Sequence, residues 1–177
     1  MFWEDQIINK PNVIKHIIKS KLGLLKHIDS NECIISNIND DEVILKFINN
    51  NSLQQYQSCD TCLGLYNSGE LVSIMTFKKT DENWEIINIC DKLGYNIEGN
   101  VNSLIDYFIK SFSPELIIYY DSLDINMFNC YRFEEKEILE SVYFIDKDMN
   151  RYDQEPGSFR YKIYNCGKIK YVLNLKK

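Results

Sequence analysis

The sequence predicts an α/β domain in which a central mixed, mostly antiparallel sheet is flanked by helices. Residues 62–77 form an apolar hairpin, because Asn67-Ser68-Gly69 supplies a turn between two β-rich runs. Residues 84–90 are also β-rich and apolar, which favours a buried strand beside the hairpin. A glycine-containing loop, an amphipathic helix and a further strand follow in that order, so strands and helices alternate along the chain.

The N-terminal part, residues 1–30, is expected to form a basic helical arm. Apolar residues recur at helical spacing over residues 12–25, while the lysines lie mostly on other faces. Pro11 suits the first turn of such a helix, and Gly23 suits its exit. The favoured interpretation is a helix that covers the core and exposes its lysines to solvent; an arm that faces DNA or docks a partner is the alternative. His16 and His27 are expected on a solvated face.

The main body, residues 31–177, begins with a predicted strand over 32–38. The acids Asp40-Asp41-Glu42 suit the first turn of a short helix that runs to about residue 49. After the hairpin and the buried strand, residues 91–100 form a loop with two glycines, and residues 101–112 form the amphipathic helix. Pro114 ends this unit, and residues 115–120 form the next strand. Residues 161–175 are expected to form a hairpin through Cys166-Gly167.

This order of elements is the one used by acyl-coenzyme A binding folds of the GNAT type. The fold by itself does not settle the function, because one fold hosts many activities. In an acyltransferase, backbone N–H groups at the start of the helix cradle the pyrophosphate of coenzyme A. The candidate cofactor-binding residues are therefore Gly99, Asn100 and Val101, although Glu98 and Asp106 bring negative charge close to them.

Composition and charge restrict the class of partner. The chain has 177 residues, which suits one domain with a hydrophobic core. Its formal net charge of −6 argues against nonspecific electrostatic binding to nucleic acid. Any DNA contact must be local. The six cysteines fit buried thiols of a cytoplasmic, reducing compartment, and Cys59 and Cys62 lack the second ligand pair of a metal site, so no metal is expected. No apolar run approaches the ~20 residues that cross a bilayer, so no membrane partner is expected.

The chain resembles the C-terminal domain of phage and giant-virus homing-type endonucleases, which is similar to GNAT acyltransferases and to Mom-type enzymes that modify adenine in phage DNA. The resemblance covers most of the chain and implies a role in viral DNA metabolism. The nuclease residues of such proteins are absent, so this chain alone is not expected to cleave DNA. The segments that carry the resemblance are residues 17–23, 64–66, 70–77, 90–94, 103–109 and 163–169.

The resemblance also points to two catalytic candidates. Tyr131 occupies the position where a GNAT enzyme often donates a proton to the leaving thiolate, and Asp121 is the acid that follows the strand after the helix. The family shows two arginines and a tryptophan after that strand, whereas this chain reads Tyr120-Asp-Ser-Leu-Asp-Ile125. The missing arginines favour a catalytically degenerate GNAT-like domain, of viral or mobile-element origin, that binds DNA or a protein.

The alternative function is an N-acyltransferase that depends on acyl-coenzyme A and modifies a nucleobase, an amine or a protein. No cofactor is expected for the degenerate module, and acetyl-coenzyme A or another acyl-coenzyme A is expected for the enzyme. Apolar surface left exposed by a missing companion domain would also favour a homo-oligomer.

Overall fold

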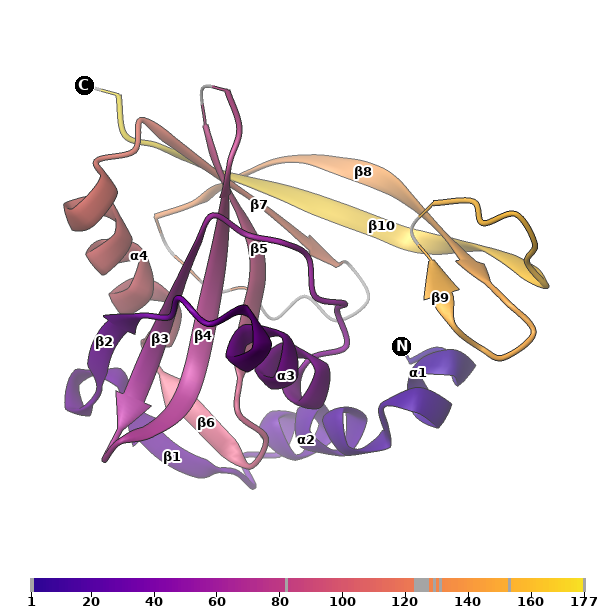
Figure 1. Ribbon diagram of the computed structural model, residues 1–177, viewed down its shortest axis with the longest axis horizontal. Helices are drawn as coiled ribbons and strands as arrows, with labels where there is room; N and C mark the ends of the chain where they lie inside the picture. The colour runs from indigo at the N-terminus through magenta and orange to yellow at the C-terminus, as the bar shows by residue number, and fades with distance from the viewer. Residues whose placement is uncertain are drawn as a thin grey trace.

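The computed structural model describes residues 2–81, 83–122, 128, 130, 132–152 and 154–176. Within these residues the main sheet has eight strands in the order β2-β3-β4-β5-β7-β10-β8-β9, and β1 and β6 form a separate two-stranded parallel ladder (Figure 1). Neighbouring strands of the main sheet run antiparallel, except β5 and β7, which run parallel. The predicted α/β class with a mixed, mostly antiparallel sheet is confirmed.

The elements follow one another along the chain from α1 to β10. The helices are α1 (Glu4–Asn9), α2 (Pro11–Lys21), α3 (Asp41–Asn51) and α4 (Asn100–Phe112), and a 3-10 turn covers Ser30–Glu32. The first five strands are β1 (Lys26–Asp29), β2 (Ile34–Asn37), β3 (Thr61–Asn67), β4 (Glu70–Lys79) and β5 (Trp84–Asp91). The remaining strands are β6 (Tyr95–Glu98), β7 (Leu116–Ser122), β8 (Glu134–Ile145), β9 (Arg151–Tyr152) and β10 (Tyr161–Asn174).

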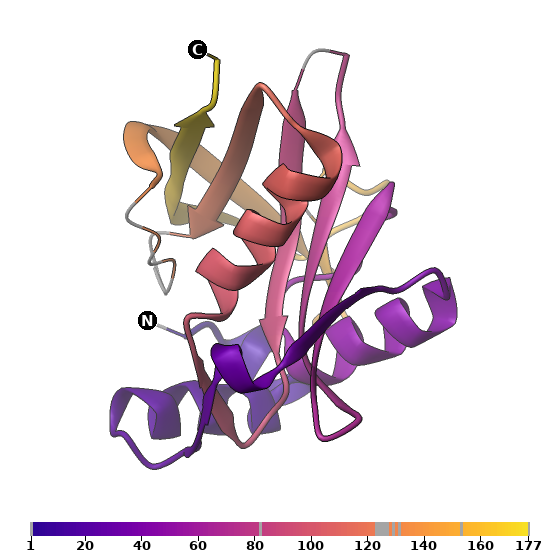
Figure 2. The ribbon, with the colours of Figure 1, turned by 90° about the vertical axis from the view of Figure 1, so that its left-hand side faces the viewer.

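Helices α4 and α3 cover opposite faces of the sheet (Figures 1 and 2). On the α4 face, Phe108 stacks on Phe77 of β4 with ring centroids 3.7 Å apart, inside a cluster of fully buried aliphatic residues. On the α3 face, Ile44 and Ile48 pack against Ile74 of β4. Because side chains alternate along a strand, β4 supplies both clusters, and this double burial explains its nearly continuous apolar sequence.

The C-terminal tail differs from its prediction. Residues 161–174 form one long strand, β10, and not a hairpin. Cys166-Gly167 resembles a turn in the sequence, but the pairing of β10 with β8 continues through it: Asn165 pairs with Ser141 and Lys168 with Leu139, which leaves one extra residue on β10. Gly167 has φ of +111°, so the glycine accommodates a bulge instead of a chain reversal.

The N-terminal arm packs against the body. Val13, Ile14 and Ile17 of α2 are buried, and its lysines at 15, 19 and 21 are exposed, as expected for a helix that covers the core. Asp5 of α1 is buried and forms a bidentate pair with Arg151 of β9, with N–O distances of 2.8 and 2.9 Å. The arm therefore contacts both the body, through α2, and the strand β9, which pairs with the end of β8. No helix in the described part of the chain is long and apolar enough to cross a membrane.

Candidate functional site

The two parallel strands at the centre of the sheet pair only briefly and then separate. β5 pairs with β7 at three positions, from Trp84 opposite Ile117 to Ile86 opposite Tyr119. The pairing of β5 with β4 skips Ile87, because Phe77 pairs with Ile86 and Thr76 with Asn88. A bulge bends its strand and increases the local twist, so Ile87 marks the point where β5 leaves β7. Ligands of α/β sheets bind in a crevice at the carboxyl ends of parallel strands.

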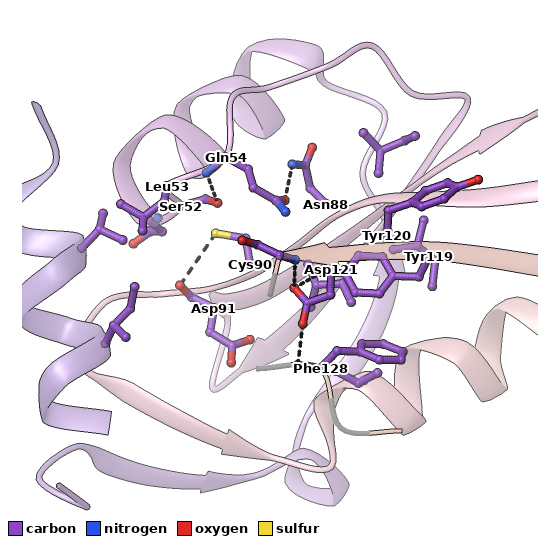
Figure 3. Close-up of a pocket in the computed structure, with 18 of the residues that line it drawn as sticks. Ser52, Leu53, Gln54, Asn88, Cys90, Asp91, Tyr119, Tyr120, Asp121 and Phe128 are labelled. Atoms are coloured by element: carbon purple, nitrogen blue, oxygen red, sulfur yellow. Dashed lines mark hydrogen bonds between the residues drawn. The ribbon is translucent and has the colours of Figure 1, made fainter. Parts of the chain in front are cut away.

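A pocket of about 960 Å³ lies at these carboxyl ends (Figure 3). Its lining comes from the diverging halves of β5 and β7, the start of α4, the segment after α3, the inner face of α2 and the far ends of β8 and β9. The volume suits a ligand of drug size or larger. Nine of the lining side chains are amides: Gln6, Asn51, Gln54, Gln55, Gln57, Asn88, Asn96, Asn100 and Asn102.

The start of α4 forms one end of the pocket. The first bond inside the helix runs from the Ser103 N–H to the Gly99 carbonyl oxygen, 3.0 Å away, so the three preceding N–H groups have no partner within the helix. One of them, the Val101 N–H, donates to Asn100 Oδ1 at 2.7 Å. Gly99 has φ of +76°, and a Cβ atom there would lie 2.7 Å from Ser30 Oγ. Both the backbone conformation and the close packing therefore require glycine.

Negative charge accompanies this helix start. The Asn100 side-chain amide donates to Asp91 Oδ1 at 2.6 Å. Burial raises the pKa of Asp91 to about 6, although hydrogen bonds from Ser73 and Asn100 partly oppose that rise. Glu98 also lines the pocket, and its carboxylate lies 3.3 Å from His27 Nε2. An anionic ligand at the start of α4 therefore meets favourable N–H groups and an unfavourable Asp91 charge.

Gln54 spans the opening between the separated strands (Figure 3). The Asn88 amide of β5 donates to Gln54 Oε1 at 3.0 Å, and the Gln54 side chain also hydrogen bonds to the hydroxyl of Tyr119 on β7. Burial, followed by the charge of Asp121, raises the pKa of Tyr119, so this phenol stays protonated at neutral pH. Gln54 thus joins the two strands by polar contacts at the point where their backbones no longer pair.

Asp121 is held by bonds to its own loop. Its Oδ1 accepts the Ser122 N–H at 2.9 Å and the Tyr119 hydroxyl at 3.4 Å, and its Oδ2 accepts the Phe128 N–H at 3.1 Å. The side chain lines the pocket but is buried. These contacts indicate that Asp121 fixes the chain at the end of β7, and an acid or base role for it stays a prediction.

Glu85 is an acid of the pocket that the sequence did not single out. It lies two residues before the bulge and pairs with Ile118 of β7. Burial raises its pKa, and Lys78 and Lys168 partly oppose the rise. A carboxyl group whose pKa is raised by burial is suited to exchange protons with a ligand. Tyr120 and Tyr143 also line this pocket.

The structure brings four of the five predicted site residues to one pocket: Gly99, Asn100, Val101 and Asp121. Tyr131 lies outside the described residues, so its role stays a prediction. Sequence reasoning missed Glu85, Asp91, Gln54 and His16. His16 is half-buried in the pocket wall, where its Nδ1 accepts the Gly94 N–H at 3.1 Å, so the expectation of a solvated face was wrong for it.

The described cysteines behave as packed thiols. Cys62 and Cys90 are buried in the cluster under α3, Cys59 is half-buried beside them, and burial raises the pKa of each thiol. A thiol with a raised pKa is a poor nucleophile and a poor metal ligand. Among the described residues, no group of three or more His, Cys, Asp or Glu side chains is arranged to hold a metal ion.

Comparisons with known proteins give the fold. No family model matches the chain, and no curated relative matches it either. The ribosomal-protein-S18-alanine N-acetyltransferase from Escherichia coli is similar in structure, with a TM-score of 0.57 and 12% identity over 82% of this chain and 95% of the other. A Bacillus subtilis acetyltransferase solved in complex with CoA gives a TM-score of 0.55 and 18% identity over 81% of this chain and 99% of the other.

A third similar structure is a GNAT family acetyltransferase from Elizabethkingia anophelis with acetyl-CoA bound. Its TM-score is 0.52, and it is 12% identical over 82% of this chain and 99% of the other. Identities this low show similarity of fold alone. The GNAT-like fold predicted from the order of elements is confirmed.

Proposed function

We propose that this protein is an N-acyltransferase that transfers an acyl group from acyl-coenzyme A to an amine. The observation that carries the proposal is the separation of β5 from β7 at the Ile87 bulge, which opens a 960 Å³ pocket with the start of α4 at its end. Structures with CoA or acetyl-CoA bound share this fold, which supports the same class of donor here.

The cleft fits an extended acyl donor by its hydrogen-bonding capacity. Where two parallel strands separate, their facing N–H and C=O groups lose each other as partners and need new ones. The pantetheine part of coenzyme A carries two amides and is narrow enough to lie between strands. The N–H groups at the start of α4 would face its pyrophosphate, as helix starts do for anions generally. Gly99, Asn100 and Val101 would hold the donor at this end.

Acyl-coenzyme A supplies the acyl group as a thioester, whose carbonyl carbon an amine can attack. Glu85 is placed to accept a proton from the amine, because its carboxylate lines the pocket close to the bulge and its pKa is raised. The leaving thiolate needs a proton donor, and Tyr120, which lines the pocket, and Tyr131 are the candidates. Backbone N–H groups freed at the bulge are suited to stabilise negative charge on the carbonyl oxygen.

The test is release of free thiol from acetyl-coenzyme A in the presence of primary amines: a polyamine, an aminoacyl peptide and an aminonucleoside. We expect the wild-type protein to turn over at least one of these amines. Glu85→Gln should lose turnover but still bind acetyl-coenzyme A. Absence of acetyl-coenzyme A binding in a folded wild-type protein would contradict the proposal. Lys46→Gln is the matched control, since Lys46 lies in α3 with an exposed side chain.

A second candidate function is the degenerate module expected from the sequence, which would bind DNA or a protein and derive from a phage or giant-virus endonuclease. The observation that favours it is the Asp91 carboxylate at the start of α4, where a pyrophosphate would lie. Asn100 also occupies the Val101 N–H with its own side chain. This module predicts no coenzyme A binding at millimolar concentration, together with salt-sensitive binding of short duplex DNA if DNA is the partner.

A further inference from the structure

Most of the N-terminal arm carries positive charge without any acid, although the chain as a whole is acidic. Residues 6–28 contain five lysines, at 10, 15, 19, 21 and 26, and neither Asp nor Glu, while the whole chain has a formal net charge of −6. Lys15, Lys19, Lys21 and Lys26 are exposed, and Lys10 is half-buried with its Nζ donating to the Asn49 carbonyl oxygen. Four exposed lysines therefore lie on one short segment.

Large apolar side chains are exposed among these lysines. Ile18 is 47% exposed, and Leu22 and Leu24 are each 65% exposed. On a helix, residues three, four and seven apart share a face, so Lys15, Ile18, Lys19 and Leu22 form one outward stripe on α2, opposite the buried Val13, Ile14 and Ile17.

The chain turns directly after this stripe. Gly23 has φ of +66°, and Leu24 follows it at the tip of the turn that leads into β1. We use the name Leu22–Leu24 tip for the exposed lysines and large apolar residues between residues 15 and 26: Lys15, Ile18, Lys19, Lys21, Leu22, Leu24 and Lys26. The tip lies at the end of the molecule formed by α2, β1 and β6 (Figures 1 and 2).

Two acids near Lys26, Glu98 and Glu70, already have partners outside the tip, although the charge of Lys26 also acts on Glu70. Glu98, on the strand that pairs with β1, lies 3.3 Å from His27 Nε2. Glu70 accepts from Lys92 Nζ at 2.5 Å and from the Tyr95 hydroxyl at 3.0 Å, and Lys26 Nζ lies 5.4 Å from the centre of the Tyr95 ring. The tip therefore presents lysines whose charge is not cancelled by a partner carboxylate within the segment itself.

We propose that the Leu22–Leu24 tip binds the surface of an anionic lipid bilayer. Lysines near such a surface are attracted to its acidic headgroups, and exposed leucines between them enter the boundary between headgroups and acyl chains. Duplex DNA would use the lysines but would leave the leucines in water. A second copy of the chain would bring the lysines of both copies together, and like charges repel.

This surface is compatible with the lack of any apolar run that could span a membrane. A protein that lies on a bilayer needs only a short basic and apolar segment. The inner face of α2 lines the pocket through Val13, His16 and Ile17, so a bilayer at the outer face would lie next to the candidate site without blocking the carboxyl ends of β5 and β7.

The test is co-sedimentation of the full chain with vesicles of phosphatidylcholine alone and of phosphatidylcholine mixed with phosphatidylserine. We expect binding to the mixed vesicles only. Leu22→Ser with Leu24→Ser should weaken it by about tenfold through lost apolar contact, and Lys19→Gln with Lys21→Gln by about thirtyfold through lost charge. The control is Ile34→Ser, which removes an apolar side chain that is 74% exposed on the distant strand β2. All the substituted side chains are exposed, so unfolding midpoints should match the wild type.

Three results would overturn the proposal. The first is no binding to the mixed vesicles by the folded wild-type protein. The second is binding that the leucine variant retains in full, because charge alone would then suffice, as for DNA. The third is a dimer that the leucine variant loses while vesicle binding is absent, because the tip would then serve contacts between copies. None of these outcomes depends on acyl transfer, so the vesicle experiment tests the lipid-binding surface independently of the proposed acyltransferase function.

Discussion

Asn100 and Asp91 are joined by a hydrogen bond of 2.6 Å from the Asn100 amide to the Asp91 carboxylate, at the entrance to helix α4. The bond links the carboxyl end of β5 to the first residue of the helix. It fixes the helix start relative to the strand and places an acid where an anionic ligand would bind. If coenzyme A binds here as proposed, the balance between this carboxylate and the helix N–H groups would decide its affinity.

Asp91 should make stability depend on pH. Burial raises its pKa from 3.8 to about 6 in the folded state, so the folded protein binds this proton more tightly than the unfolded chain does. The resulting stabilisation is present below about pH 4 and is lost as the pH rises through about 6. Asp91→Asn should therefore increase the free energy of unfolding at neutral pH by an amount on the order of 2 kcal/mol, and by little at about pH 4. Urea unfolding at both pH values measures this, and an equal change at both would contradict it.

Gly99→Ala should destabilise the protein through two effects. Its positive φ disfavours any L side chain, and the new Cβ atom would lie 2.7 Å from Ser30 Oγ. We expect a loss of about 2–3 kcal/mol in the free energy of unfolding. Gly69→Ala is the matched control, because Gly69 has φ of +82° but open space around its Cβ position. Equal losses in the two variants would show that the contact with Ser30 contributes nothing.

The kcat values of two phenylalanine variants should show whether Tyr131 or Tyr120 donates the proton to the leaving thiolate. If Tyr131 protonates the leaving thiolate, Tyr131→Phe should lower kcat by about a hundredfold while the unfolding midpoint changes little. Tyr120→Phe should then have a small effect on kcat, although its side chain lines the pocket. The reverse pattern would assign the proton to Tyr120. Unchanged turnover in Tyr131→Phe would remove Tyr131 from the mechanism.

The Asp5–Arg151 pair should contribute strongly to the attachment of the N-terminal arm. The Asp5 and Arg151 side chains are only 6% and 18% exposed, so either charge left alone would be largely desolvated. Asp5→Ala should cost about 3–5 kcal/mol, whereas Glu115→Ala, which breaks an ion pair with side chains 65% and 64% exposed, should cost less than about 1 kcal/mol. Thermal unfolding compares them. A double variant, Asp5→Ala with Arg151→Met, should recover part of the loss, and no recovery would argue against a desolvated charge as the cause.

The order of elements from β2 to β7 could be predicted from the sequence because the signals were local, with one exception: the predicted loop 91–100 contains the strand β6, which pairs with β1. The strands β1, β8 and β9 and the helix α1 were not predicted. The Asn67-Ser68-Gly69 turn, the apolar face of residues 101–112 and Pro114 each act within a few residues, and the fold follows from their order. Cys166-Gly167 shows the limit of such signals. A glycine allows a turn or a bulge, and only the pairing of β10 with β8 along its whole length decides for the bulge.

The sequence predicted the pocket residues at the start of the helix and Asp121 at the end of β7, but no others. Gly99, Asn100 and Val101 follow from a local pattern, whereas Glu85 becomes a site residue only because β7, more than thirty residues later in the chain, separates from β5 beyond it. Gln54 and His16 enter the pocket from the segment after α3 and from α2. Their positions depend on how the helices pack on the sheet. Hydrophobic spacing along the chain does not show which residues of a helix come close to the end of a distant strand.

Calorimetric titration of the purified chain with acetyl-coenzyme A shows whether the cleft between β5 and β7 binds an acyl donor. We expect saturable binding with one site per chain, and tighter binding by Asp91→Asn because a negative charge beside the pyrophosphate is removed. A parallel titration with short duplex DNA at two salt concentrations covers the second candidate function. If neither the folded wild-type protein nor folded Asp91→Asn binds acetyl-coenzyme A, with or without DNA binding, the cleft is not a site for an acyl donor.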